Sequence, residues 1–210
     1  MDSAKKIARE MLDAINVDGS GLLGAVAKGF ISFPVTFGYL GYDFIDTDHR
    51  RENLDDKDRL ARLVKTATFN RHLIEKVIAV FIDDFTARID RVLMAEKIGG
   101  SIAGGIIFSQ LTGFKIGSAI SERAVQAFIA GTVVISILSI GAEASRAIYT
   151  SRYLRERNPV AYYKLKGMGD LDLLYFLIED AVKPFEKACE VSNANKEEFN
   201  NICQYFLGGL

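Results

Sequence analysis

Two uncharged runs near the middle of the chain restrict its fold more than any other feature. Residues 98–114 and 124–142 contain no ionisable side chain, although charged residues make up 25% of the chain. A helix needs about 20 apolar residues to cross the hydrocarbon layer of a membrane. The second run nearly reaches this length and the first is slightly shorter. We therefore expect an apolar helical hairpin over 98–142, buried either in a protein core or in lipid.

Small residues recur along this hairpin at the spacing of one helical turn. They let a second helix approach closely, which in lipid replaces the missing hydrophobic drive for helix association. In water each glycine would cost roughly 1 kcal/mol relative to alanine. In a globular bundle the same glycines would serve only the close crossing of two core helices. The residues predicted to pack in this way are Gly100, Ser101, Gly104, Gly105, Ser109, Gly113, Gly117, Ser121 and Gly131.

Three charged residues interrupt the apolar segment. Lys115 follows the first run, and Glu122 and Arg123 separate the two runs. A charge within a bilayer is costly and tends to mark an ion pathway. These residues are therefore candidates for the hairpin tip and for an ion path. The alternative is a solvated loop between two core helices.

The flanking segments read as amphipathic helices. Apolar residues recur at helical spacing over 3–15 and over 60–97, the latter as one long helix or two shorter ones. The β-branched run 133–140 would also suit a strand, but the absence of turn signals around it favours a helix. We therefore predict an all-α bundle, a single domain over 1–210, in which amphipathic helices surround the hairpin.

Local signals place several boundaries and one contact in the flanking segments. Asn158 and Pro159 should end one helix, and the glycines of 167–169 should end the next. Asp170 is positioned to cap the helix that follows. Asp84 and Arg88 are four residues apart, the spacing of an ion pair on a helix.

The overall charge is balanced, but its distribution is not. The chain has 26 Lys and Arg against 27 Asp and Glu, so nothing favours binding to nucleic acid. Residues 43–58 carry a net charge of −4 and residues 146–166 a net charge of +5. The basic segment is predicted to meet an anionic membrane surface. Its basic residues are Arg146, Arg152, Arg155, Arg157, Lys164 and Lys166.

No motif in the sequence assembles a catalytic or metal site. A GxGxxG pattern over 19–24 lacks the strand that a dinucleotide fold places before it. The acidic residues at 46–48 lack the glycine of a calcium loop. We predict no enzymatic activity, no metal and no cofactor. The remaining candidate ligands and nucleophiles stand without partners at a suitable spacing: His49, His72, Cys189 and Cys203.

With an uncharged hairpin at 98–142 among amphipathic helices, the chain resembles the pore-forming domains of colicins and the small membrane-depolarising effectors of bacterial secretion systems. The resemblance implies a pore-forming toxin or effector that depolarises a bacterial membrane. It implies anionic lipid as the partner, self-association on insertion, and an immunity or chaperone protein. No signal peptide is visible at 1–6. We therefore expect synthesis in the cytoplasm and a soluble form that later enters a target membrane.

Two other functions fit the same residues. One is a soluble helical binding module, such as an adaptor or an immunity-type partner, in which the glycines serve packing alone. The other is a small integral membrane protein, for which the apolar stretch 21–42 would be a further span.

Overall fold

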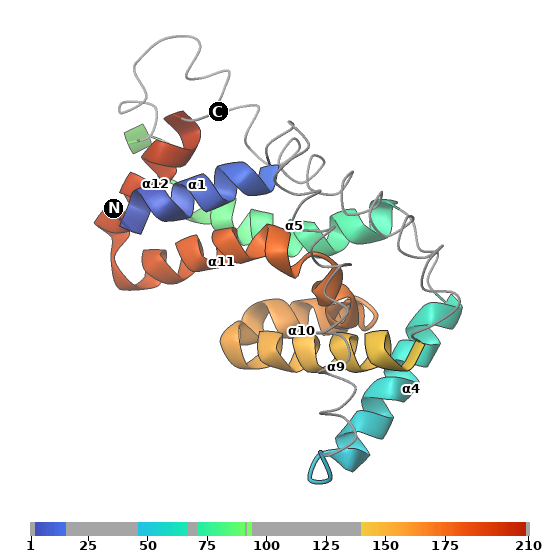
Figure 1. Ribbon diagram of the computed structural model, residues 1–210. Helices are drawn as coiled ribbons and strands as arrows, with labels where there is room; N and C mark the ends of the chain where they lie inside the picture. The colour runs from blue at the N-terminus through green and yellow to red at the C-terminus, as the bar shows by residue number, and fades with distance from the viewer. Residues whose placement is uncertain (1–2, 16–45, 67–70, 91, 94–139, 209–210) are drawn as a thin grey trace. The chain divides into compact units, whose positions relative to one another are not determined.

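The computed structural model describes residues 3–15, 46–66, 71–90, 92–93 and 140–208 (Figure 1). Every regular element in these ranges is a helix, and none of their residues forms a strand. The prediction of an all-α fold is therefore confirmed. The predicted hairpin lies outside the described residues, except for 140–142, which begin a helix.

The described helices belong to two compact units, and each is described by itself. The single domain predicted over 1–210 stays a prediction. The first unit contains α1 (Ser3–Ile15), α5 (Arg71–Arg88) from Ile78 onward, α11 (Glu179–Ala194) from Asp180 onward, and α12 (Lys196–Gly208). The second unit contains α4 (Arg50–Thr66), α9 (Ile140–Arg157), α10 (Pro159–Gly167) and the 3-10 helix η1 (Leu171–Leu177).

Aromatic rings fill the core of the first unit. Phe85 of α5 is fully buried and meets three phenylalanine rings edge to face. Its centroid lies 5.4 Å from that of Phe185, 5.8 Å from Phe199 and 6.0 Å from Phe206. Edge-to-face contacts of this kind add to the free energy gained by burying the rings. Phe85 therefore joins α5 to both α11 and α12.

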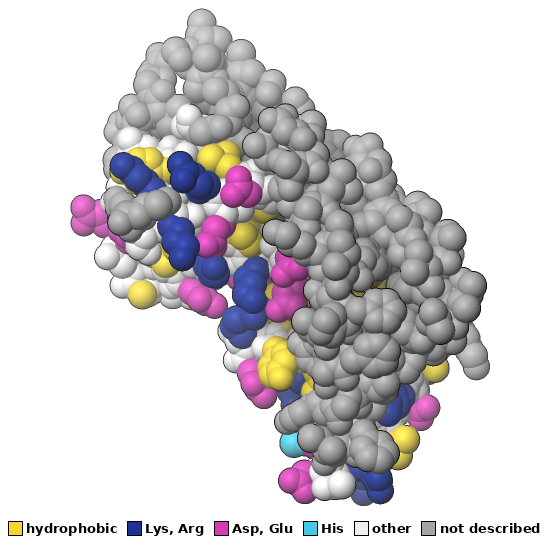
Figure 2. All heavy atoms as spheres, in the orientation of Figure 1, with side chains coloured by type: hydrophobic (Ala, Val, Ile, Leu, Met, Phe, Trp, Pro, Cys, Tyr) yellow, Lys and Arg dark blue, Asp and Glu magenta, His cyan; other side chains and the backbone are white. Residues whose placement is uncertain are grey.

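Helix α1 packs against α12 through one apolar face (Figure 1). Ala4, Ala8 and Met11 are buried at helical spacing, whereas Ile7 and Leu12, which the sequence pattern places on the buried face, are only partly buried. On the other side of the helix, Glu10 accepts a hydrogen bond from Lys187 Nζ at 2.7 Å. Charges of both signs are interspersed over the surface around α1 and α11 (Figure 2), so this surface has no single dominant charge.

The predicted breaks fall where expected in the second unit. Helix α9 ends at Arg157, and Asn158 caps α10 by accepting a hydrogen bond from the Ala161 N–H at 3.1 Å. Pro159 occupies the first turn, where its missing N–H costs nothing. Helix α10 ends at Gly167, and Gly169 follows with a φ of +99°, which glycine adopts without strain.

Two helices, α4 and α5, include described residues of the segment predicted as one long helix or two shorter ones, and residues 67–70 between them lie outside the described part. Helix α4 ends at Thr66 and α5 begins at Arg71. In α5, Arg88 Nε donates to Asp84 at 3.1 Å, which confirms the predicted pair. No helix in the described part of the chain combines the length and the apolar character needed to span a bilayer.

Candidate functional site

A buried ionic cluster lies at the centre of the second unit. Its core is Arg59 of α4, whose guanidinium is 9% exposed and donates to three carboxylates. Nε donates to Asp170 at 2.7 Å, and Nη1 donates to Asp56 at 2.8 Å. Nη2 donates to both oxygens of Asp172, at 2.6 and 2.8 Å. The guanidinium therefore uses its nitrogens on all sides, as a planar fork of donors allows.

Asp172 is the most enclosed acid of the cluster. Its side chain is 0% exposed, and it lies within the run of buried residues in η1, directly after Leu171. Besides Arg59, it accepts a hydrogen bond from the Ser151 hydroxyl of α9 at 2.6 Å. A buried carboxylate is tolerated only when its charge and lone pairs are satisfied in this way. Asp172 thus ties α4, α9 and η1 to one point.

A second arginine balances much of the remaining negative charge. Arg152 of α9 donates to Asp56 Oδ2 at 2.9 Å and 3.2 Å through Nη2 and Nε. The cluster then contains three carboxylates, those of Asp56, Asp170 and Asp172, against two guanidinium groups. Asp170 is the most exposed of the three acids, so the uncompensated charge lies toward solvent.

The local environment pushes the pKa of Arg59 in two directions. Burial works to lower this pKa because it disfavours the charged form. The hydrogen bonds to Asp172 and Asp170 and the charge of Asp172 outweigh burial, and the pKa of Arg59 is raised. The guanidinium is therefore a permanent cation, and every acid it contacts is held as an acceptor.

The cluster is suited to holding helices together rather than to chemistry. Its carboxylates are occupied by arginine and serine donors, which leaves none positioned as a general base. Ser151 donates its hydroxyl hydrogen to an acid, and no histidine is recorded beside this hydroxyl among the side chains that the structure describes. In the described part of the chain, no group of three or more His, Cys, Asp or Glu side chains could hold a metal ion.

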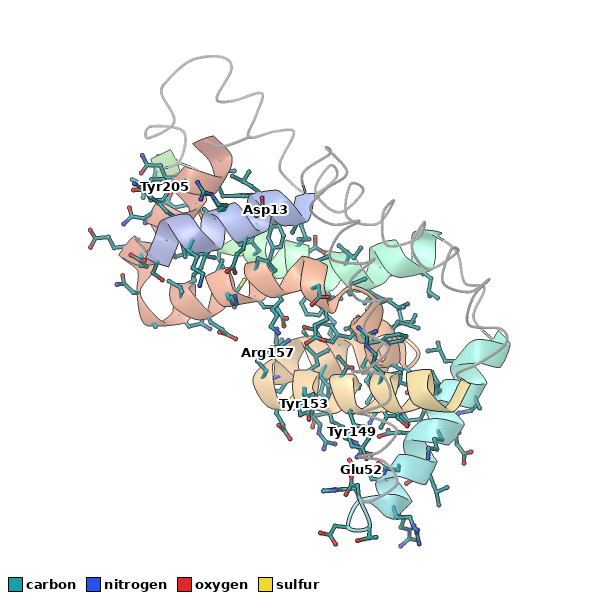
Figure 3. The ribbon with its side chains drawn as sticks, viewed as in Figure 1. Asp13, Glu52, Tyr149, Tyr153, Arg157 and Tyr205 are labelled. Carbon is teal, nitrogen blue, oxygen red and sulfur yellow. The ribbon has the colours of Figure 1, made fainter. Side chains whose placement is uncertain are left out.

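A smaller polar chain joins the start of α4 to α9. The Tyr149 hydroxyl donates to Asp46 at 2.9 Å and accepts from Asn53 Nδ2 at 3.1 Å. Asp46 also lies 2.8 Å from Nδ1 of the exposed His49. The His49 hydrogen bond lowers the pKa of Asp46, desolvation opposes it, and the Tyr149 hydrogen bond adds to the lowering. Figure 3 shows Tyr149 on the side of α9 near Glu52 of α4.

The structure separates the six basic residues that the sequence predicts at a membrane surface. Arg152 is buried against Asp56, so its charge is not presented at a surface. Arg155 donates to Glu52 at 2.9 Å, and this hydrogen bond raises its pKa. Arg157 bonds the Tyr175 hydroxyl and lies 4.0 Å from Glu179. These arginines link elements of the second unit to one another.

Of the other three basic residues, Arg146 is partly buried and the two lysines are exposed. The guanidinium of Arg146 lies 5.6 Å from the centre of the Phe176 ring, a cation–π distance. Lys164 and Lys166 are both exposed on α10, and Lys166 donates to the Tyr162 hydroxyl at 3.1 Å. The lysines are therefore the members of the predicted set that present their charges outward.

The residues predicted to pack the hairpin, and the three charged residues predicted at its tip, lie outside the described part of the chain. They are Gly100, Ser101, Gly104, Gly105, Ser109, Gly113, Gly117, Ser121, Gly131, Lys115, Glu122 and Arg123. Among the other candidates, Cys189 and Cys203 are buried free thiols. Burial raises the pKa of both, that of Cys203 to about 12, which makes them poor nucleophiles.

The ionic cluster is not among the predictions from the sequence, although one signal for it exists. Asp172 interrupts an apolar run between Leu171 and Leu173, and all three residues are buried. An acid in such a run needs a buried cation. Asp170 was expected to cap a helix, but its side chain makes no cap hydrogen bond and turns to Arg59 instead.

Comparisons of this chain with protein-family models, with curated proteins and with solved structures found no match.

Replacing Arg59 with methionine should strongly destabilise the second unit. The change leaves Asp172 buried without its cation, and losing one partner of a buried pair costs about 3 to 5 kcal/mol. Arg155→Met is the matched control, because the Arg155–Glu52 pair is more than a third exposed on both sides. Such pairs contribute about 0 to 1 kcal/mol. Urea unfolding followed by circular dichroism measures both, and equal losses would contradict the assigned role of the cluster.

The lowered pKa of Asp46 makes a pH-dependent contribution to stability. The folded state favours the ionised carboxyl, so the contribution is complete above the ordinary value of 3.8. It is lost as the pH falls through the lower folded value. The wild type should therefore melt above Asp46→Asn at neutral pH, and the gap should close in acid. A gap that does not change with pH would show that the charge of Asp46 is irrelevant.

Proposed function

We propose that this chain is a membrane-inserting protein whose segment 98–142 enters the lipid, and that it acts as a pore-forming toxin or effector on bacterial membranes. One contrast carries the proposal. Every described helix contains ionisable side chains, whereas 98–114 and 124–142 contain none. An uncharged segment of this length beside charged helices is typical of a part that leaves water.

The described helices support the proposal by what they do with their own apolar residues. Phe85, Phe185 and Tyr175 are buried within the two units, and the second unit closes its interior with paired charges. The described helices thus bury aromatic side chains against one another, as Phe85 does against Phe185. In the proposal the apolar segment enters lipid, where its small residues would pack against neighbouring helices.

In the proposed mechanism the hairpin inserts into an anionic membrane and copies of the chain associate. Gly113 and Gly117 would lie at the contact between helices, where side chains larger than hydrogen would hold the backbones apart. Lys115, Glu122 and Arg123 would face the path of the ions, since a charge within lipid is costly unless it meets water or another charge. Ion flow through the assembly would depolarise the membrane.

A charged substitution within the small-residue stripe tests this function. Gly113→Asp should abolish dye leakage from vesicles of equal parts phosphatidylcholine and phosphatidylglycerol, at neutral and mildly acidic pH. An acid at the centre of a spanning helix costs about 3 kcal/mol. The soluble form should keep its helical content and melting temperature.

Gly208→Asp is the matched control, because a Cβ at this exposed position would meet nothing within 4 Å. It should leak dye as the wild type does. The proposal fails if the wild type causes no leakage. If Gly113→Asp instead lowers the melting temperature, the glycines serve the core of a soluble binding module.

A further inference from the structure

Helix α10 exposes an apolar face that the second unit does not use. Its inner face buries Ala161, Tyr162 and Leu165. On the outer face Val160 is 79% exposed and Tyr163 is 64% exposed. Met168 follows one turn beyond Lys164 and is 41% exposed. Large apolar side chains grouped on one short helix are a common mark of a binding surface.

The grouping is local to this part of the second unit. Among the described residues, large exposed hydrophobic side chains elsewhere stand alone on their elements, such as Leu54 on α4 and Tyr205 on α12. Tyr153, near the end of α9, is 48% exposed (Figure 3).

The charged residues of α10 itself are all basic. Residues 158–169 include Lys164 and Lys166 and no acid. Asp170, which comes next, has its carboxylate paired with Arg59 at 2.7 Å. The exposed acid Glu156 precedes the break at Asn158 and belongs to α9. The outer face of α10 therefore combines apolar side chains with the exposed Lys164, and Lys166 nearby is exposed and donates to the Tyr162 hydroxyl at 3.1 Å.

We propose that this face docks on an anionic lipid surface. Val160, Tyr163 and Met168 enter the headgroup layer, while Lys164 and Lys166 extend along it to the lipid phosphates. Tyrosine suits this layer because its ring is apolar and its hydroxyl is wet. A protein partner is disfavoured because lysine is depleted in protein–protein interfaces. The inference rests on the proposed function and supplies the step that brings 98–142 to the membrane.

Cosedimentation of the full chain with vesicles tests the docking face. The wild type should bind vesicles of equal parts phosphatidylcholine and phosphatidylglycerol and should bind pure phosphatidylcholine far more weakly. The double variant Val160→Ser, Tyr163→Ser should bind the anionic vesicles about tenfold more weakly, since two apolar side chains no longer leave water. Lys164→Gln should weaken binding about fivefold through the loss of one charge.

Two control variants separate the face from general effects. Leu54→Ser removes a side chain that is 59% exposed on α4 of the same unit, and it should bind as the wild type does. Lys196→Gln removes an exposed lysine on α12 and should also leave binding unchanged. Circular dichroism should show the same helical content in all variants, because the replaced side chains lie outside the core.

The possible outcomes distinguish docking from insertion. Docking is supported if the α10 variants lose binding to anionic vesicles and the control variants do not. This holds even if the wild type binds without causing leakage, because absence of leakage contradicts only the proposed function. If the α10 variants bind anionic vesicles as strongly as the wild type does, docking is overturned. If these variants also still cause leakage, the proposed function stands. Equal losses of binding in the control variants Leu54→Ser and Lys196→Gln also overturn docking. Failure of the wild type to bind anionic vesicles also overturns docking on lipid. A protein partner would then be the next candidate for this face.

Discussion

The bond between Arg59 and Asp172 is the interaction on which the second unit depends. It joins residues 113 positions apart, and the Ser151 hydroxyl extends it to a third element. Neither charge could be buried without the other, because the cost of desolvation is recovered only by their attraction and hydrogen bonds. The helices α4, α9 and η1 are therefore held together, because the buried charge of Arg59 must be paired with that of Asp172. The apolar contacts around them fill the remaining space.

This arrangement explains why α10 presents its lysines to solvent. The arginines of α9 have acids or aromatic rings to meet within the unit, as Arg152 does with Asp56 and Arg155 with Glu52. The lysines of α10 face outward beside exposed Val160 and Tyr163. Arginine suits fixed multidentate pairing and lysine suits a mobile, hydrated charge. In this unit arginines therefore form the internal pairs, and lysines occupy exposed positions.

Much of the helical framework could be predicted because its causes are local. Asn158 and Pro159 mark a helix boundary by their own backbone chemistry, and the Asp84–Arg88 pair needs only a spacing of four. The ionic cluster could not be predicted in this way, because it depends on which segments meet. The net charge of 146–166 shows that the segment is basic but does not reveal that Arg152 is buried against an acid. Only Asp172, an acid within an apolar run, carried a sign of the buried pair.

The central claim is that 98–142 enters lipid while the charged helices stay outside it. A fluorescent label can be attached at Ser109→Cys, since both native thiols are buried and burial raises their pKa, which disfavours their labelling. The same label at Lys76→Cys, an exposed position on α5, serves as the reference. With anionic vesicles that contain lipids spin-labelled deep in the acyl chain, quenching is predicted at residue 109 and not at residue 76. Absence of quenching at residue 109, with the protein bound to the vesicles, would contradict the account.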